Sequence, residues 1–85
     1  MWTGVQWTGT LPGGATQRWF TFGWPTAWHV YWYMMPTSPQ LGSPEVEWNV
    51  AVERANATQC TYWITVKNLT SNAVTFEGRY AVLSP

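Results

Sequence analysis

Hydrophobic and polar residues alternate along most of the chain, most regularly in residues 45–54. Val46, Trp48, Val50 and Val52 occupy every second position there, and glutamate, asparagine and alanine fill the positions between them. Because a period of two places successive side chains on opposite faces of an extended chain, this segment is predicted to be a β-strand with one solvated face. The same period predicts five further strands in residues 3–11, 17–24, 27–35, 60–68 and 73–83.

Turn-forming residues separate these six segments. Pro12-Gly13-Gly14 follows the first, and residues 36–44 contain three prolines and a glycine, which neither a helix nor a central strand accommodates. Short polar links join the last three segments, which are therefore predicted to form an antiparallel meander. Six short strands favour an all-β fold, a small antiparallel β-sandwich in a single domain of residues 1–85. A compact, partly closed β-barrel is the alternative, because the sequence does not define which edge strands pair.

Bulky aromatic residues are concentrated in residues 18–35, which hold four of the eight tryptophans. The alternation assigns one set to the core: Phe20, Phe22, Trp24, Trp28 and Trp32. It assigns a second set to the opposite face: Trp19, His29, Tyr31 and Tyr33. The histidine and the two tyrosines combine an apolar ring with a polar tip, which suits a subunit interface or a ligand surface. We therefore expect a partner on this second face.

The composition adds a second reason to expect a partner. Only 9% of the residues are charged, whereas an average soluble domain has roughly 25%. Aromatic residues make up 18%, which suits a short chain that must pack a dense core. The shortage of charge predicts that part of the apolar surface meets another subunit or a ligand. We expect a homo-oligomer.

The charge balance narrows the range of partners. The four basic and four acidic residues cancel and form no run of one sign, so nucleic acid is not an expected partner. No apolar segment approaches the roughly 20 residues that span a bilayer, and the N-terminus lacks the features of a signal peptide. Membrane attachment is not expected. The sequence does not fix the cellular compartment, because the chain would remain in the cytoplasm as given but could be cut from a longer precursor.

The sequence contains no catalytic or cofactor-binding motif. It lacks a phosphate-binding glycine loop and a serine nucleophile elbow, and it has one histidine, one cysteine and no aspartate as candidate metal ligands. Glu45, Glu47 and Glu53 share a strand face, but acidic residues that alternate with valine are typical of a solvated face rather than of a catalytic pair. We expect no enzymatic activity, no cofactor and no metal.

Two other sequence features have a structural and a functional interpretation. Cys60, the only cysteine, is predicted to be a reduced thiol, and the alternatives are an intersubunit disulfide or a reactive thiol assisted by His29. Asn56-Ala57-Thr58 and Asn68-Leu69-Thr70 match the acceptor pattern for N-glycosylation. Both lie in predicted turns, where asparagine and threonine are ordinary residues, so we interpret both as turn-forming sequences.

A candidate ligand site lies on the outward face of the predicted meander. Trp63 is expected there beside Glu77 and Arg79, with Glu47 and Asn49 on the adjoining strand. An exposed indole among carboxylate, amide and guanidinium groups can stack on a sugar ring while the polar groups bond to its hydroxyls. A cation–π pair between Arg79 and Trp63 is the structural alternative.

The sequence thus favours a non-enzymatic, lectin-like module that binds carbohydrate and acts as a homo-oligomer. The alternative is a self-assembly module, in which the aromatic face with Trp19, His29, Tyr31 and Tyr33 is an obligate subunit interface. Insertion of tryptophans into a membrane interface is a weaker third hypothesis, because no basic amphipathic element accompanies them.

Overall fold

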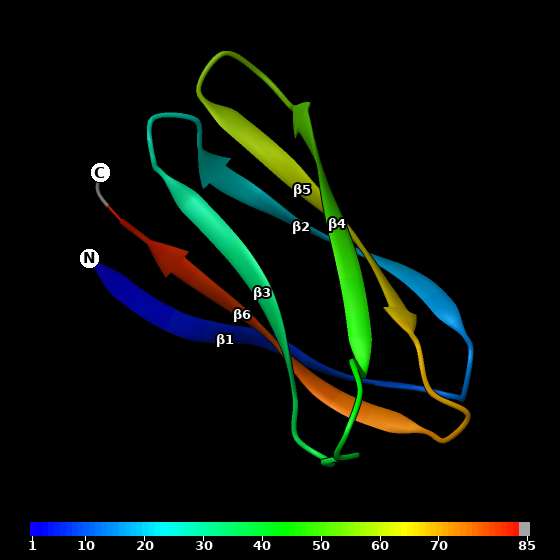
Figure 1. The fold of residues 1–85 in the computed structure, drawn as a ribbon. Helices are drawn as coiled ribbons and strands as arrows, with labels where there is room; N and C mark the ends of the chain where they lie inside the picture. The colour runs from blue at the N-terminus through cyan, green and yellow to red at the C-terminus, as the bar shows by residue number, and fades with distance from the viewer. Residues whose placement is uncertain (84–85) are drawn as a thin grey trace.

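The computed structural model describes residues 1–83 as six antiparallel strands. The strands are β1 (Trp2–Leu11), β2 (Thr16–Pro25), β3 (Val30–Pro36), β4 (Val46–Arg54), β5 (Gln59–Asn68) and β6 (Val74–Val82). They form two three-stranded sheets, sheet A with the order β1-β6-β3 and sheet B with the order β2-β5-β4 (Figure 1). The predicted all-β sandwich is therefore confirmed, and the sheets do not close into a barrel. The described residues include no helix that could cross a membrane.

The chain changes sheet at four of its five connections. Only β4 and β5 follow one another within a sheet, as an antiparallel hairpin. The predicted meander of the last three strands is therefore wrong for β6, which leaves sheet B and pairs with β1 on one side and β3 on the other. This crossing places β6 at the centre of sheet A and β5 at the centre of sheet B, which leaves the other four strands as edges.

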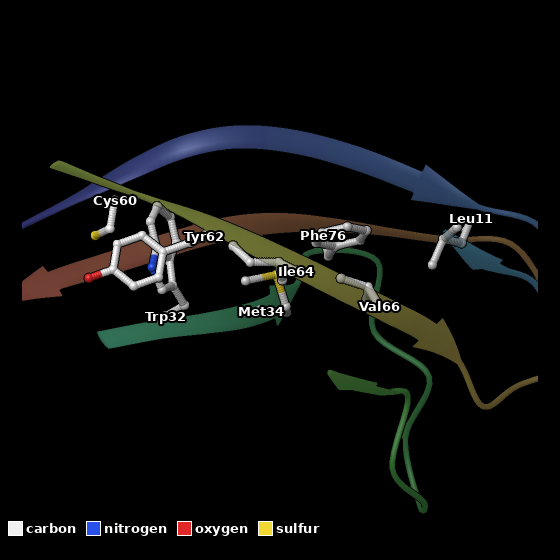
Figure 2. Packing of buried hydrophobic residues seen from close by; sticks show 8 residues of the cluster. All are labelled: Leu11, Trp32, Met34, Cys60, Tyr62, Ile64, Val66 and Phe76. Carbon is white, nitrogen blue, oxygen red and sulfur yellow. The ribbon is translucent and has the colours of Figure 1, made fainter. Parts of the chain in front are cut away.

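The core lies between the two sheets (Figure 2). Its buried members come from both sheets: Leu11, Trp32, Met34, Cys60, Tyr62, Ile64, Val66 and Phe76. Nine aromatic rings, six of them tryptophans, form one connected network of ring contacts through this core. Trp24, Trp28 and Trp32 belong to the network, as the alternation predicts. Aromatic rings supply much of the buried area that so short a chain needs.

A β-bulge in β2 reverses part of the predicted assignment of faces. The register shifts just before Trp24, where Gly23 adopts a φ of 80°, and the extra residue turns Trp24 inward. Trp19 is also inward, because it packs against the core, so its predicted outward position is wrong. Phe20 and Phe22 are 59% and 74% exposed, so their predicted place in the core is also wrong.

Three glycines of the β1–β6 pair make room for aromatic rings. Each glycine lies directly opposite the ring that covers it, in the pairs Gly4–Tyr80, Trp7–Gly78 and Gly9–Phe76. A Cβ atom at any of the three glycines would come within 2.5–2.8 Å of that ring. The absence of a side chain on one strand thus admits a large side chain from the other, which is how two narrow sheets enclose so many rings.

A fully buried asparagine joins the two sheets at one end of the sandwich. The Asn68 amide nitrogen donates to the carbonyl oxygens of Leu11, Pro12 and Asn72 at 3.1, 3.1 and 2.7 Å. The Asn68 Oδ1 accepts from the backbone N–H and the hydroxyl of Thr70, both at 2.8 Å. The interpretation of Asn68-Leu69-Thr70 as a turn-forming sequence is therefore confirmed, and this side chain satisfies backbone groups at two connections between the sheets.

The first Asn-x-Thr sequence forms a turn of the same kind on the surface. Asn56 Oδ1 accepts from the backbone N–H groups of Thr58 and Gln59, both at 2.9 Å, in the exposed β4–β5 hairpin. Its interpretation as a turn-forming sequence is also confirmed. The two asparagines therefore make the same local turn in two different environments, one exposed and one fully buried.

Tyr62 gives the core a predictable response to alkaline pH. Burial raises the pKa of Tyr62 from 10.0 to about 12, and the contact with the Cys60 thiol is the second cause of this rise. The folded protein therefore holds the phenol proton more tightly than the unfolded chain does. The contribution of this shift to the stability of the folded protein is fully present below pH 10 and is lost as the pH rises towards 12.

We expect the free energy of unfolding to fall between pH 10 and 12, with up to about 1.4 kcal/mol per pH unit coming from Tyr62. Denaturant titrations at a series of alkaline pH values measure this slope. Tyr62→Phe removes the phenol and is expected to flatten the slope, whereas Tyr31→Phe, at a tyrosine that is 60% exposed, should leave it unchanged. Equal slopes for the wild type and Tyr62→Phe would contradict the prediction.

Candidate functional site

The crossing of β6 separates the group of residues that the sequence predicts as a ligand site. Trp63 lies on β5, and Glu47 and Asn49 lie on β4, so these three belong to sheet B. Glu77 and Arg79 lie on β6 in sheet A. The outer faces of the two sheets point in opposite directions, so Glu77 and Arg79 do not border Trp63. The structure therefore divides the predicted site into two surfaces.

The first surface is an aromatic stack on the outer face of sheet B. The register places Phe20 of β2 directly opposite Trp63 of β5, and their ring centroids are 5.1 Å apart. Phe22, two residues further along β2, continues the stack at 6.3 Å from Phe20. Because Phe20 and Phe22 are more than half exposed, the stack presents apolar ring surface to the solvent.

Two charged side chains hold Trp63 in this stack. The Arg18 guanidinium lies 5.1 Å from the centre of the indole ring in a cation–π contact. The indole N–H donates to Glu53 Oε1 at 2.7 Å. The sequence suggests Arg79 as the cation on Trp63, and the structure shows Arg18 in that position. Trp63 is thus a fixed part of the surface, whereas the phenylalanine rings beside it are free to contact a ligand.

A shallow hollow of about 350 Å³, lined mainly by residues with polar side chains, adjoins the aromatic stack on the same face. Its lining residues come from all three strands of sheet B: Thr16, Glu47, Trp48, Asn49, Thr65 and Lys67. The register sets Thr65 between Arg18 and Asn49, two residues along the strands from the row that contains Phe20 and Trp63. Successive rows on one face lie about 6.8 Å apart, so a single extended ligand can touch both the stack and the hollow.

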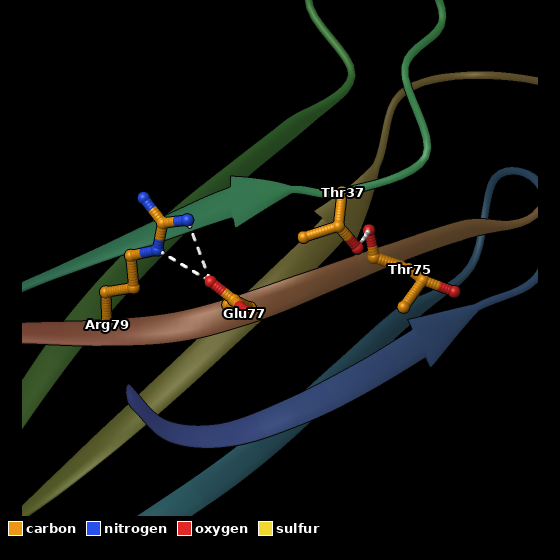
Figure 3. A network of polar contacts seen from close by, with 4 residues as sticks. All are labelled: Thr37, Thr75, Glu77 and Arg79. Carbon is orange, nitrogen blue, oxygen red and sulfur yellow. Dashed lines mark hydrogen bonds and ion pairs between the residues drawn. The ribbon is translucent and has the colours of Figure 1, made fainter. Parts of the chain in front are cut away.

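The second surface is the outer face of sheet A, where Tyr33 of β3, Arg79 of β6 and Val5 of β1 lie in one row. Arg79 donates to Glu77 Oε1 from both Nε and Nη2, at 2.9 and 2.8 Å (Figure 3). Its guanidinium carbon is 5.8 Å from the centre of the Tyr33 ring. The ion pair with Glu77 raises the pKa of Arg79 above its ordinary value. This surface therefore contains an ion pair in which the two charges neutralise each other.

The structure divides the predicted aromatic face as well. Tyr31 and Tyr33 lie on the outer face of sheet A, where Tyr31 is opposite Ala81 and Tyr33 is opposite Arg79 in the register. His29 is exposed in the connection between β2 and β3, where its carbonyl accepts from the N–H of Leu83 at 2.9 Å. Trp19 is inside the sandwich. Two of the four predicted residues therefore form one surface with Arg79.

Sequence reasoning misses the two phenylalanines that dominate the surface of sheet B. Strict alternation groups Phe20 and Phe22 with Trp24, and Trp24 is indeed inside. The bulge at Gly23 separates them. An isolated glycine within a strand pattern is a recognised sign of a bulge, so Gly23 is the signal that could have identified the exposed pair.

Neither a metal centre nor a known relative suggests a function for this site. Within residues 1–83, no three histidine, cysteine, aspartate or glutamate side chains gather as metal ligands do. No protein-family model, no curated protein and no solved structure shows significant similarity to this chain.

Proposed function

We propose that the protein is a non-enzymatic, carbohydrate-binding module that binds its ligand on the outer face of sheet B. The observation that carries this proposal is the exposed aromatic stack beside an open hollow whose lining includes five polar or charged side chains. A sugar chain has apolar ring faces and a rim of hydroxyl groups, so it needs both kinds of surface side by side. Aromatic rings supply the first kind, and groups that donate and accept hydrogen bonds supply the second.

The hollow has hydrogen-bonding capacity to offer a ligand. The hydroxyls of Thr16 and Thr65, the Asn49 amide, the Glu47 carboxylate and the Lys67 ammonium group make no side-chain hydrogen bond to other residues in the described part of the chain. Glu47 and Lys67 lie opposite one another in the register and cancel in charge. A hollow without net charge supports a neutral, hydroxyl-rich ligand in preference to an anionic or cationic one.

The phenylalanines are the expected points of stacking. Trp63 already contacts Arg18 and Phe20 and bonds to Glu53, so its role is to support the neighbouring rings. Phe22 is the more exposed of the two phenylalanines and lies at the end of the stack. Removing its ring therefore changes the ligand surface with little effect on the core.

Phe22→Ala is expected to weaken glycan binding by about two- to tenfold, because an aromatic stacking contact contributes roughly 0.5–1.5 kcal/mol. A glycan array first identifies the ligand, and titration calorimetry then measures the dissociation constant. Asn49→Ala, in the hollow, should weaken binding as well. Tyr31→Ala removes a ring that is also more than half exposed, from the opposite sheet, and should leave the dissociation constant for a monovalent glycan unchanged.

Two results would overturn the proposal. One is the absence of binding to every glycan on the array at millimolar concentrations. The other is a dissociation constant that responds to Tyr31→Ala and ignores Phe22→Ala, since this would locate the ligand on sheet A.

A further inference from the structure

Charge is distributed very unevenly between the two sheets. Of the four basic and four acidic residues, six lie on the strands of sheet B or immediately before β4: Arg18, Glu45, Glu47, Glu53, Arg54 and Lys67. Sheet A contains only Glu77 and Arg79, and these two pair with one another at 2.8 Å. The outer face of sheet A therefore has no net charge and no unpaired charged residue among those that the structure describes.

The bulkiest of the remaining residues on this face are ones that protein interfaces favour. Tyr31, Tyr33 and Met35 extend along β3, and the β1 bulge brings Val5 to the same side, opposite Arg79. Tyrosine, methionine and arginine are enriched at protein–protein interfaces, whereas lysine and acidic residues are depleted, and Glu77 is the one acidic residue among those described on this face. Tyr31 is 60% exposed and Val5 is 51% exposed, so the chain by itself leaves much of this apolar surface uncovered.

We propose that the outer face of sheet A binds a second copy of this chain in a two-fold symmetric dimer. A two-fold interface must be complementary to itself, because the same patch meets itself. The face of sheet A meets this condition, since it combines one positive and one negative side chain with rings and has no net charge. The six charged residues of sheet B also sum to zero, but none of them forms an ion pair in the described part of the chain, so a partner on that face would have to cover unpaired charges.

The position of the ion pair defines the symmetry axis. Glu77 and Arg79 lie two residues apart on the central strand, on either side of Gly78. A two-fold axis in the plane between the two facing sheets, perpendicular to β6 and passing over Gly78, sets Glu77 opposite Arg79 of the partner subunit, and Arg79 opposite the partner's Glu77. Each charge then gains a second partner of opposite sign, and the tyrosine-rich β3 strands lie alongside the pair. The molecule measures 42 × 23 × 17 Å, so its broad face can supply roughly the 800 Å² per partner that stable interfaces bury.

Reversing one charge of the pair tests this geometry. Arg79→Glu creates two facing pairs of carboxylates in the symmetric dimer, so we expect the dissociation constant of the dimer to rise by at least about tenfold. Sedimentation velocity across a concentration series measures it, because the dimer has twice the 9.7 kDa mass of the chain. The exchanged variant Glu77→Arg with Arg79→Glu restores opposite charges across the axis and is expected to restore the dimer.

A matched control separates this interface from a general effect of charge. Lys67→Glu makes the same change of charge on the outer face of sheet B and should leave the dimer intact. Tyr31→Asp, at an exposed position, provides a second disrupting variant if Arg79→Glu unfolds the protein.

A wild-type chain that is monomeric at high micromolar concentration would overturn the proposal, and so would a dimer that dissociates on Lys67→Glu and survives Arg79→Glu. Neither result depends on whether sheet B binds glycans.

Discussion

Replacing Asn68 by alanine is expected to lower the free energy of unfolding by roughly 3 kcal/mol, because it removes the five hydrogen bonds that this fully buried side chain makes. The wild-type amide bonds to three carbonyl oxygens and accepts from Thr70, all at one end of the sandwich. The alanine side chain replaces none of these bonds and is too small to fill the space. Urea-induced unfolding, followed by tryptophan fluorescence, measures the loss.

Asn56 provides a matched control for this prediction. It makes the same Asn-x-Thr turn, with Oδ1 accepting from the N–H of Thr58 at 2.9 Å, but it is exposed in the β4–β5 hairpin. Water can replace its bonds, so Asn56→Ala is expected to cost less than about 1 kcal/mol. If the two variants lose similar stability, the burial of Asn68 does not make its hydrogen bonds more important to stability than those of Asn56.

Gly78→Ala is the second change with a large expected effect, a loss of about 3 kcal/mol at the upper end of the usual range for overpacking. A Cβ at position 78 would lie 2.5 Å from ring atoms of Trp7. The indole has little room to move, because its centroid is 5.8 Å from that of Trp19, and Phe76 and Trp32 also contact it. The added methyl group therefore forces the backbones of β1 and β6 apart.

A double-mutant cycle tests whether Trp7 is the cause. Trp7→Leu shortens the side chain opposite position 78 and is itself destabilising because it leaves a cavity. In that background Gly78→Ala should cost little, which gives a coupling energy of about 2 kcal/mol. If Gly78→Ala costs the same amount with leucine at position 7 as with tryptophan, the clash with Trp7 does not explain the effect.

The two proposals assign different tasks to the two outer faces. Dimerisation through sheet A would leave both copies of the aromatic stack on sheet B exposed, on opposite sides of the assembly. Two sites of this kind can bind a multivalent glycan more tightly than one site does, without any new contact. The low charge of the chain would then reflect two surfaces, one for a second copy and one for a ligand.

The alternation of residues by itself determined much of the fold. It identified six strands close to their observed positions, and the inward residues Tyr62, Ile64 and Val66 of β5 are buried as the pattern requires. Turn-forming sequences correctly placed the β4–β5 hairpin and the turns at Asn56 and Asn68. These features are readable because side-chain direction and turn preference depend on residues close together in the chain.

Only the tertiary structure decided which strands pair and which side chains share a face. β6 crosses to sheet A, where its partners in β1 are 63–80 residues away in the sequence and those in β3 are 40–52 residues away. Glu77 and Arg79 are therefore separated from Trp63. The bulge at Gly23 turns Trp24 inward and leaves Phe20 and Phe22 outside. The pairing of distant strands and a shift of register depend on how whole faces pack. One extra residue in a strand moves every side chain after it to the opposite face.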